Sequence, residues 1–291
     1  MGDVKRILVA GASGVLGREV VRALQDRGHW TRALCRSSAR AEGLPASEIV
    51  IADALHPCSL KHVADGVDVV FSCLGQTVSS DLSIRRPGYR SVDVPANRNL
   101  LCAAKEAGVH RFVYVSVLHA GRFPHVAYLD AHAQVAAAVK ASGLVYGIIE
   151  PTGFFSLFKV LLEMASSNRA VVFGSGNSKS NPIDENDLAG ICADVIEAEG
   201  SSVVAVGGPV VYSRRQMLEL AFETLGKPAR IREVPLWIPG LMSRLARWPA
   251  PRVADLMGFL QALGANDFVA PPLGKRTLED HLRSIATSVL S

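Results

Sequence analysis

The chain has 291 residues, of which 49% are hydrophobic and 20% charged, a composition that is ordinary for a globular enzyme and excludes a largely disordered protein. Its formal net charge is +4, and its 31 basic residues are dispersed along the chain, so no nucleic-acid partner is expected. The apolar run near the N-terminus is too short for a signal peptide and no segment reaches the roughly 18 apolar residues of a membrane span, so we expect no integral membrane segment and a cytoplasmic location.

Apolar runs of strand length alternate with longer helical patterns over the first 150 residues, which is typical of repeated βαβ units. The predicted strands are Arg6–Ala10, His29–Leu34, Ile49–Ala52, Val67–Cys73, Arg111–Val115 and Val145–Glu150. Right-handed crossovers between them predict the strand order 3-2-1-4-5-6, with a ligand crevice at the carboxyl ends of the strands. The expected fold class is α/β, a doubly wound parallel Rossmann sheet with a smaller, mostly helical C-terminal part.

The pattern changes after Pro151. The expected elements are a helix at Phe155–Ser167, a strand at Ala170–Phe173, a helix ending at Ala198, a strand at Val203–Val206, and helices after the N-caps Ser213 and Thr277. We predict a Rossmann domain at 1–154, with its sheet completed by 182–208. A substrate-binding or lid part is expected at 155–181 and 209–291.

A glycine-rich turn joins the first strand to the first helix. Gly11 suits a tight turn, Gly14 the close approach of backbone to a pyrophosphate, and Gly17 the packing of helix against strand. The other residues of the turn and helix start, Ser13, Val15 and Leu16, are expected to contact the same ligand. The segment predicts a bound nicotinamide dinucleotide.

The ends of the next strands indicate which dinucleotide binds. Arg36 follows the second strand, where an NAD-binding protein would carry an acid for the ribose 2′-hydroxyl. Arg36 can pair with a 2′-phosphate, or it can be a solvated surface residue. Cys73, Leu74 and Gly75 end the fourth strand where a small segment can pass the pyrophosphate and ribose. The predicted cofactor is NADP(H).

The Gly-x-x-Gly-x-x-Gly spacing resembles that of extended and atypical short-chain dehydrogenases. The segments 109–117 and 141–155 resemble the NmrA-like branch, and 173–176, 182–187, 207–209 and 274–280 look most like the divinyl chlorophyllide 8-vinyl reductases. The resemblance implies an adenine contact at Asp53 and Ala54. It also implies a turn beside the nicotinamide, formed by Pro151, Thr152, Gly153 and Phe154.

The same resemblance implies a catalytic serine and a Tyr-x-x-x-Lys helix. Ser116 matches the serine, and Tyr128 matches the tyrosine, but His132 stands in place of the lysine. A neutral imidazole can bond a ribose, yet it depresses the tyrosine pKa less than a permanent cation. Tyr128 and His132 are therefore either a catalytic pair or an ordinary half-buried tyrosine and a structural histidine, with His119 and His125 as alternative proton donors.

A further departure is Glu150, which precedes Pro151 where relatives carry arginine; a changed internal ion pair is the simplest interpretation. The five cysteines form no C-x-x-C pair and no zinc-like spacing with histidine, so no metal is expected and the thiols are expected to be buried and reduced.

Aromatic and apolar side chains suggest the substrate. They are Phe155, Phe158, Leu161, Trp237 and Met242, each of which can instead be simple core packing. The segment 236–248 is expected to act as a lid, or to lie on a membrane surface. We expect a monomer or homodimer that acts as an NADP(H)-dependent oxidoreductase on an apolar, aromatic or polycyclic molecule. The alternatives are a non-catalytic NADP(H)-binding sensor or assembly factor, and a cofactor-retaining cyclase, epimerase or dehydratase.

Overall fold

A single parallel sheet organises the chain, of which the computed structural model describes residues 3–76 and 88–290. The strand order is β3-β2-β1-β4-β5-β6-β9, and every neighbouring pair is parallel. The strands are β1 (Arg6–Ala10), β2 (Trp30–Cys35), β3 (Glu48–Ile51), β4 (Val69–Ser72), β5 (Arg111–Val115), β6 (Val145–Pro151) and β9 (Ser202–Val206). The predicted α/β Rossmann fold and its strand order are confirmed, and β9 extends the sheet beyond β6.

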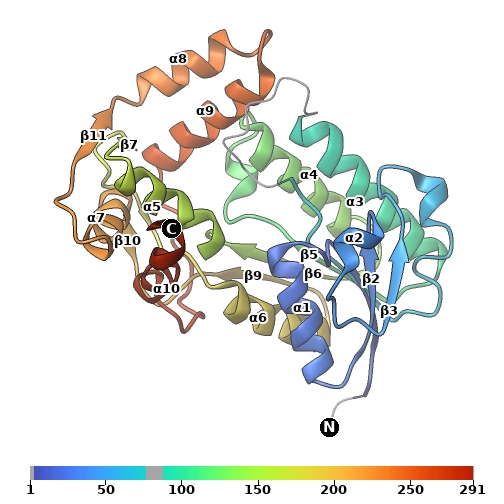
Figure 1. Ribbon diagram of the computed structural model, residues 1–291. Coiled ribbons are helices and arrows are strands. Elements are labelled where there is room, and N and C mark those ends of the chain that lie inside the picture. The colour runs from blue at the N-terminus through green and yellow to red at the C-terminus, as the bar shows by residue number, and fades with distance from the viewer. Residues whose placement is uncertain (1–2, 77–87, 291) are drawn as a thin grey trace.

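Helices cover both faces of this sheet (Figure 1). On one face lie α1 (Val15–Asp26) and α6 (Glu185–Glu197), packed on alternate strand residues such as Val9 and Phe71. On the other lie α3 (Tyr89–Glu106) and α4 (Ala127–Lys140), packed on the intervening residues such as Val70 and Phe112. Because both faces are buried, the central strands are continuous apolar runs instead of alternating ones.

Short elements connect the strands at the sheet ends. They are α2 (Ser38–Ala41) and the 3₁₀ turns Pro57–Leu60 and Ala120–Arg122. The predicted strand Val67–Cys73 proved shorter, since β4 pairs only over Val69–Ser72.

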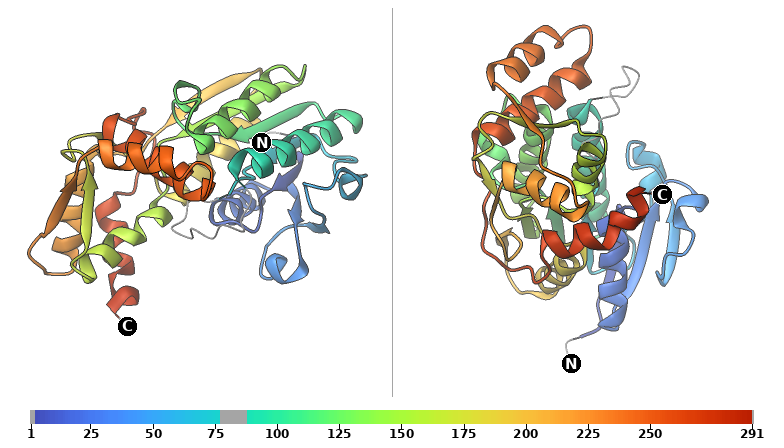
Figure 2. Two further views of the ribbon diagram at one scale, coloured as in Figure 1. Left: turned by 90° about the horizontal axis from the view of Figure 1, so that it is seen from above. Right: turned by 60° about the vertical axis from the view of Figure 1, so that its left-hand side comes forward.

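The C-terminal part forms a separate layer beside the carboxyl ends of the strands (Figure 2). Its elements are a 3₁₀ turn at Phe155–Phe158, α5 (Lys159–Ser166), β7 (Ala170–Phe173), β8 (Lys179–Ser180), β10 (Tyr212–Ser213), α7 (Arg214–Thr224), β11 (Ile231–Val234), α8 (Trp237–Leu245), α9 (Pro251–Ala265) and α10 (Leu278–Leu290). The predicted helix over 155–167 is therefore a 3₁₀ turn followed by α5. The pairing of β11 with β7 and of β10 with β8 was not predicted.

Both predicted N-caps are present. Ser213 and Gln216 form a reciprocal capping box at the start of α7. The Thr277 hydroxyl accepts a hydrogen bond from the backbone N–H of Asp280 at 3.1 Å. These caps satisfy backbone donors that the first helical turn leaves without partners.

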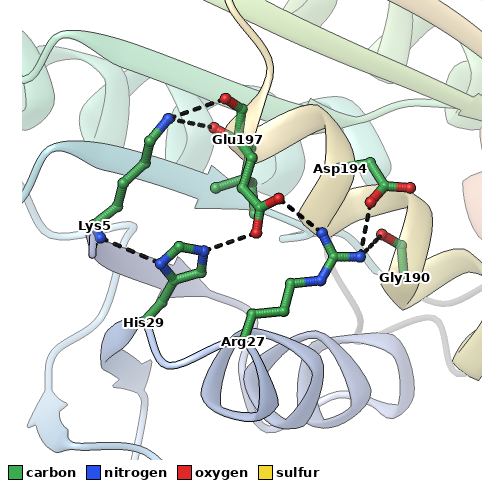
Figure 3. Close-up of polar contacts among 7 residues, drawn as sticks. Lys5, Arg27, His29, Gly190, Asp194 and Glu197 are labelled. Carbon is green, nitrogen blue, oxygen red and sulfur yellow. Dashed lines mark hydrogen bonds and ion pairs between the residues drawn. The ribbon is translucent and has the colours of Figure 1, made fainter. Parts of the chain in front are cut away.

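A polar cluster joins α1 to α6 (Figure 3). Arg27 pairs with Asp194 at 2.7 Å and with Glu197 at 3.0 Å, and Glu197 also lies 2.8 Å from Nε2 of His29. The backbone N–H of Lys5 donates to Nδ1 of His29 at 3.2 Å, so Nε2 carries the ring proton and donates to Glu197. Three segments distant in sequence are thereby held together at the amino-terminal side of the sheet.

Two of the cysteines do not match the prediction that the thiols are buried. Cys58 and Cys102 are exposed, while Cys35 and Cys192 are buried. Over residues 3–76 and 88–290, no helix is both long and apolar enough to cross a membrane.

Candidate active site

The glycine turn has the conformation that the sequence predicted. Gly11 has φ +88°, and its carbonyl accepts a hydrogen bond from the Gly14 N–H at 2.9 Å. Gly14 is the N-cap of α1 and has no side chain to occupy the helix N-terminus. A Cβ on Gly17 would lie 2.1 Å from the Gly11 carbonyl oxygen, so only glycine fits there. The turn, with Ser13, Val15 and Leu16, presents the first amides of α1 to an anion.

Two arginines lie near the end of β2: Arg36, which the sequence predicted, and Arg18 of α1, which it did not. Arg36 is exposed there, as a partner for a 2′-phosphate should be. Arg18, in the first turns of α1, donates to the carbonyls of Arg40 at 3.1 Å and Glu42 at 3.2 Å. Arg18 thus fixes the loop that follows Arg36. The sequence feature that could have identified Arg18 is its position directly after Gly17, where a long side chain can reach the end of the neighbouring strand.

The carboxyl end of β3 holds Asp53 and Ala54. An Asp53 carboxylate oxygen accepts from the Leu55 N–H at 3.0 Å, and the Ala54 carbonyl accepts from the Asn99 amide at 2.9 Å. Asn99 lies on α3, so this loop is anchored to the helix layer. Its side chains are therefore presented at the same sheet edge as the glycine turn.

The segment after β4, residues Cys73 to Gly75, lies beside the ionisable side chains of His132 and Asp93. Burial raises the pKa of the Cys73 thiol to about 12, and this sulfur lies 3.5 Å from the Ala10 carbonyl oxygen. A Cβ built on Gly75 would lie 3.9 Å from Nε2 of His132 and 4.0 Å from Oδ2 of Asp93. His132 and Asp93 therefore border the same point of the predicted cofactor segment Cys73, Leu74 and Gly75.

His132 is a buried, neutral histidine. Burial lowers its pKa to about 4, and its Nδ1 lies 2.8 Å from the Tyr114 hydroxyl. If that hydroxyl donates to Nδ1, the ring proton is on Nε2, the nitrogen nearer Gly75. In that tautomer His132 can donate one hydrogen bond toward Gly75 without carrying a charge.

Asp93 was missed by the sequence analysis. Its Oδ1 accepts from the Gln76 N–H at 3.0 Å, whereas its buried Oδ2 has no hydrogen-bond partner among residues 3–76 and 88–290. Burial raises the pKa of Asp93 to about 6, although hydrogen bonds to Gln76 and the charge of Arg252 oppose this shift. The signal was the spacing of Asp93 and Asn97, four residues apart on the buried face of α3.

Tyr128 lies against His132, as its helical spacing predicted. The two rings meet edge to face with centroids 4.9 Å apart, and Tyr89 and Phe259 each lie 5.2 Å from Tyr128. Burial, reinforced by the charge of Asp93, raises the pKa of Tyr128 above its ordinary value. The phenol is therefore protonated at neutral pH and can donate a proton or a hydrogen bond.

Ser116 directly follows β5, at the carboxyl end of that strand. Its side chain is buried, and no residue that the structure describes forms a hydrogen bond with its Oγ. The next residue, Val117, packs in the same apolar cluster as Tyr128. An unpartnered buried hydroxyl is uncommon in proteins and is expected where a ligand supplies the missing partner.

Helix α9 reaches back to this site through Arg252. The guanidinium donates to the side-chain oxygen of Gln76 and stacks over the Tyr89 ring at 4.4 Å. Arg252 is only 7% exposed. It connects α9 to the cofactor segment and, through Tyr89, to Tyr128. The sequence analysis did not single it out.

The turn after β6 is held from both sides. The Thr152 hydroxyl donates to the Asn181 carbonyl at 2.6 Å, and the Gly153 carbonyl accepts from the Ile183 N–H at 2.9 Å. Pro151 ends β6, and Phe154 forms a parallel bridge with Ile183. Segment 181–183 therefore positions the four residues of this turn at the sheet edge.

Glu150 and the two alternative histidines lie around the same strand ends. Burial raises the pKa of Glu150, while Lys140 and His119 lower it. Glu150 forms no ion pair with a described residue at 4.0 Å or less, so the suggested internal pair is not observed. His119 has a left-handed backbone, φ +58°, and its ring lies 6.4 Å from Phe268. His125 lines the groove described next.

A groove of about 720 Å³ lies between α8, α9 and the starts of α3 and α4. Val126, two residues before Tyr128, lines it, as does Gly258, the neighbour of Phe259. Of the residues suggested for a substrate pocket, Trp237 lines this groove, whereas Phe155 is fully buried in the cluster of α5, α7 and α10. Phe158 and Leu161 pack against that cluster, and Met242 is 44% exposed.

Comparison with known proteins agrees with this geometry. A family model described as NAD(P)H-binding matches residues 11–199. The photosystem II assembly factor Ycf39 of Synechocystis sp. is 27% identical over 270 residues, which are 89% of this chain and 80% of that protein. The chloroplastic divinyl chlorophyllide a 8-vinyl-reductase of Arabidopsis thaliana is 26% identical over 327 residues, 96% of this chain and 76% of that protein.

Two solved structures with a nicotinamide cofactor share the fold. The triphenylmethane reductase of Citrobacter sp., complexed with NADP(H), has a TM-score of 0.74 at 18% identity and covers 96% of this chain and 99% of its own. The NADPH-dependent quinone oxidoreductase QOR2 of Escherichia coli, complexed with NADPH, has a TM-score of 0.70 at 22% identity. The match covers 98% of this chain and 100% of that chain.

Proposed function

The chain belongs to the NAD(P)H-binding family, and on this premise we propose that it is an NADPH-dependent reductase of an apolar molecule with a carbonyl or electron-poor double bond. The observation that carries the proposal is the protonated Tyr128 packed against His132, which itself borders Gly75, on the helix that follows Ser116. Because its pKa is raised, Tyr128 still carries its proton at neutral pH and can pass it to a substrate atom on which negative charge develops as hydride arrives, so its protonation state suits reduction.

The residues present fit a nicotinamide dinucleotide. The uncapped start of α1 suits the pyrophosphate, and Arg36 and Arg18 suit a 2′-phosphate. At the other end, Asp93 offers a carboxylate oxygen that no described residue contacts by a hydrogen bond, and His132 presents its Nε2 toward Gly75. A ribose hydroxyl can both accept and donate, so these two groups would together replace the lysine that related enzymes use.

The chemistry that a bound NADPH supplies is hydride donation. Tyr128 holds the proton that completes the reduction, and Ser116 provides a second hydroxyl near the same strand end. Phe259 covers Tyr128 from α9 and helps to exclude water. The groove beside Val126 would admit the substrate, with Trp237 and Leu241 as apolar contacts and with Arg90, Arg244 and Arg247 among its polar lining.

A second candidate is an NADP(H)-binding protein without turnover. It is supported by the neutral His132 in place of a cation and by the likeness to the Ycf39 assembly factor over 80% of that protein's length. Both candidates bind the cofactor through the same turn, so binding alone does not distinguish them.

Cofactor oxidation separates the two. The protein is incubated with NADPH and a panel of quinones, triphenylmethane dyes and conjugated vinyl compounds, and absorbance at the reduced nicotinamide band is followed. The reductase proposal expects acceptor-dependent loss of absorbance. Tight NADPH binding with no loss for any acceptor would overturn it and favour the binding protein.

A further inference from the structure

Helix α8 presents an apolar stripe to solvent. Trp237, Leu241 and Leu245 lie four residues apart on one face of the helix, and Trp248 continues the series just beyond its end. Their exposed fractions are 66%, 46%, 70% and 95%. We call these four residues the α8 stripe. A water-soluble surface rarely gathers so many large apolar side chains without a partner.

The inner face of α8 already has its packing partner. Ser243 donates to the Ala254 carbonyl of α9 at 2.8 Å, and Pro239 is buried. A Cβ on Gly240 would lie 2.5 Å from the Gln261 amide nitrogen, so the two helices approach closely. Leu245 and Trp248 lie outside the groove between α8 and α9, whereas Trp237 and Leu241 line it. The exposed surface of the α8 stripe is therefore left over after α8 has packed on α9.

The charge beside the stripe has one sign. Residues 236–250 contain Arg244 and Arg247 and no acidic residue, and both arginines are exposed. Asp255 of α9 lines the adjoining groove, where Arg90 also lies, so this carboxylate has a further cation beside it. Exposed cations among exposed indole and leucine side chains complement an anionic surface that also accepts apolar groups.

The position of α8 permits contact with a broad surface. The helix lies at the top of the molecule in Figure 1 and in the right-hand view of Figure 2, with the central sheet and its helices below it. Trp248 projects almost fully into solvent. Convex, projecting side chains fit a fluid lipid layer, which needs no preformed pocket.

We propose that the α8 stripe docks on the surface of an anionic lipid bilayer, with its apolar side chains in the interface and Arg244 and Arg247 at the headgroups. Trp and Arg side chains are suited to this layer, because each has an apolar part and a polar end. The proposal concerns a surface apart from the glycine turn and does not depend on turnover.

Flotation of the full chain with vesicles tests the proposal. The probes are vesicles of phosphatidylcholine alone and of phosphatidylcholine with an equal part of phosphatidylglycerol. We expect flotation with the anionic vesicles, a shift of tryptophan fluorescence to shorter wavelength, and weakening by salt. Arg244→Gln and Arg247→Gln should each weaken binding roughly fivefold.

The decisive variant is Leu245→Asp with Trp248→Asp, and the matched control is Val211→Asp, whose native valine is 47% exposed. The double variant should lose at least about tenfold in vesicle binding, while the control keeps wild-type binding and all variants keep NADPH affinity. Wild-type protein that stays off anionic vesicles at low salt, or equal binding by the double variant, would overturn the proposal. So would a dimer that the double variant dissociates, without vesicle binding, since a second copy would then cover the stripe.

Discussion

The carboxyl group of Asp93 lies beside the predicted cofactor segment, and one of its oxygens has no hydrogen-bond partner in the described part of the chain. Its pKa of about 6 exceeds the ordinary value of 3.8 because burial disfavours the charged form. A raised pKa means that the folded state holds the proton more tightly than the unfolded chain. The associated stability is therefore fully present below about pH 4 and is lost as the pH rises through about 6.

Asp93→Asn should therefore stabilise the cofactor-free protein at pH 8, by up to about 3 kcal/mol, with the gain vanishing near pH 4. The same change should weaken NADPH binding by about fivefold, because a charge-assisted hydrogen bond becomes a neutral one. Thermal unfolding across this pH range and calorimetric titration give the two readouts. A variant that is less stable at pH 8 would show that Asp93 is satisfied without the cofactor.

Arg36 belongs to the other end of the cofactor site, where it is exposed and unpaired with any described residue. Wild-type protein should bind NADPH more tightly than NADH, and Arg36→Ala should remove about one to two decades of that preference. Arg32→Ala is a control, since Arg32 is paired with Glu48 on the neighbouring strand. Equal affinities for both cofactors in the wild type would contradict the 2′-phosphate assignment.

At the scale of elements, two glycines of the βα turn have different roles: Gly14 leaves room for a ligand, and Gly17 allows the turn to fold. A Cβ on Gly14 would meet only the Gly11 carbonyl oxygen, at 3.3 Å, whereas one on Gly17 would collide with it at 2.1 Å. Gly14→Val should retain the fold and abolish dinucleotide binding, because the side chain would take the place of the pyrophosphate. Gly17→Ala should instead destabilise the protein severely. Circular dichroism and titration on the same samples distinguish these outcomes, and undiminished binding by Gly14→Val would place the phosphates elsewhere.

The link between α1 and α6 depends on Glu197 (Figure 3). Burial alone would raise the pKa of Glu197, but hydrogen bonds from His29 and Arg27 lower it below its ordinary value. The stabilisation is therefore present above the ordinary pKa of 4.5 and lost as the pH falls through the folded value. Glu197→Gln should cost about 0.5 to 1 kcal/mol at pH 7, a value limited by solvent screening, and progressively less as the pH falls below 4.5. Urea unfolding across this pH range measures the cost, and a cost that does not fall with pH would show that the charge is not responsible.

The sequence predicted the large elements better than the small ones. The central strands are apolar runs bounded by turns, so their order followed from crossover handedness. The pairing of β7 with β11 could not be predicted, because the two strands have four residues each and lie about sixty residues apart. Local periodicity carries no information on such distant partners.

At the scale of the whole molecule, local sequence patterns also fail to predict which distant residues meet in the site. The glycine turn is contiguous, so its three glycines could be read directly. The group around Gly75 combines Asp93 of α3 with His132 of α4, and meets only because both helices cover one face of the sheet. Arg252 follows Gln76 by 176 residues. Recognition of these contacts required the folded chain.

The architecture also assigns separate tasks to its layers. The sheet and α1 hold the turn for the cofactor, α3 and α4 supply Asp93, Tyr128 and His132, and α9 covers them. The central claim is that a protonated Tyr128 completes hydride reduction at this junction.

The most direct test measures NADPH oxidation by cofactor-saturated wild-type protein and by Tyr128→Phe with the same acceptor. The two rings have nearly the same shape, so the variant removes the hydroxyl and leaves the contacts of Tyr128 with His132 and Phe259. The account predicts a rate lower by roughly 10² to 10⁴ with NADPH affinity unchanged. An equal rate in the two proteins would contradict it.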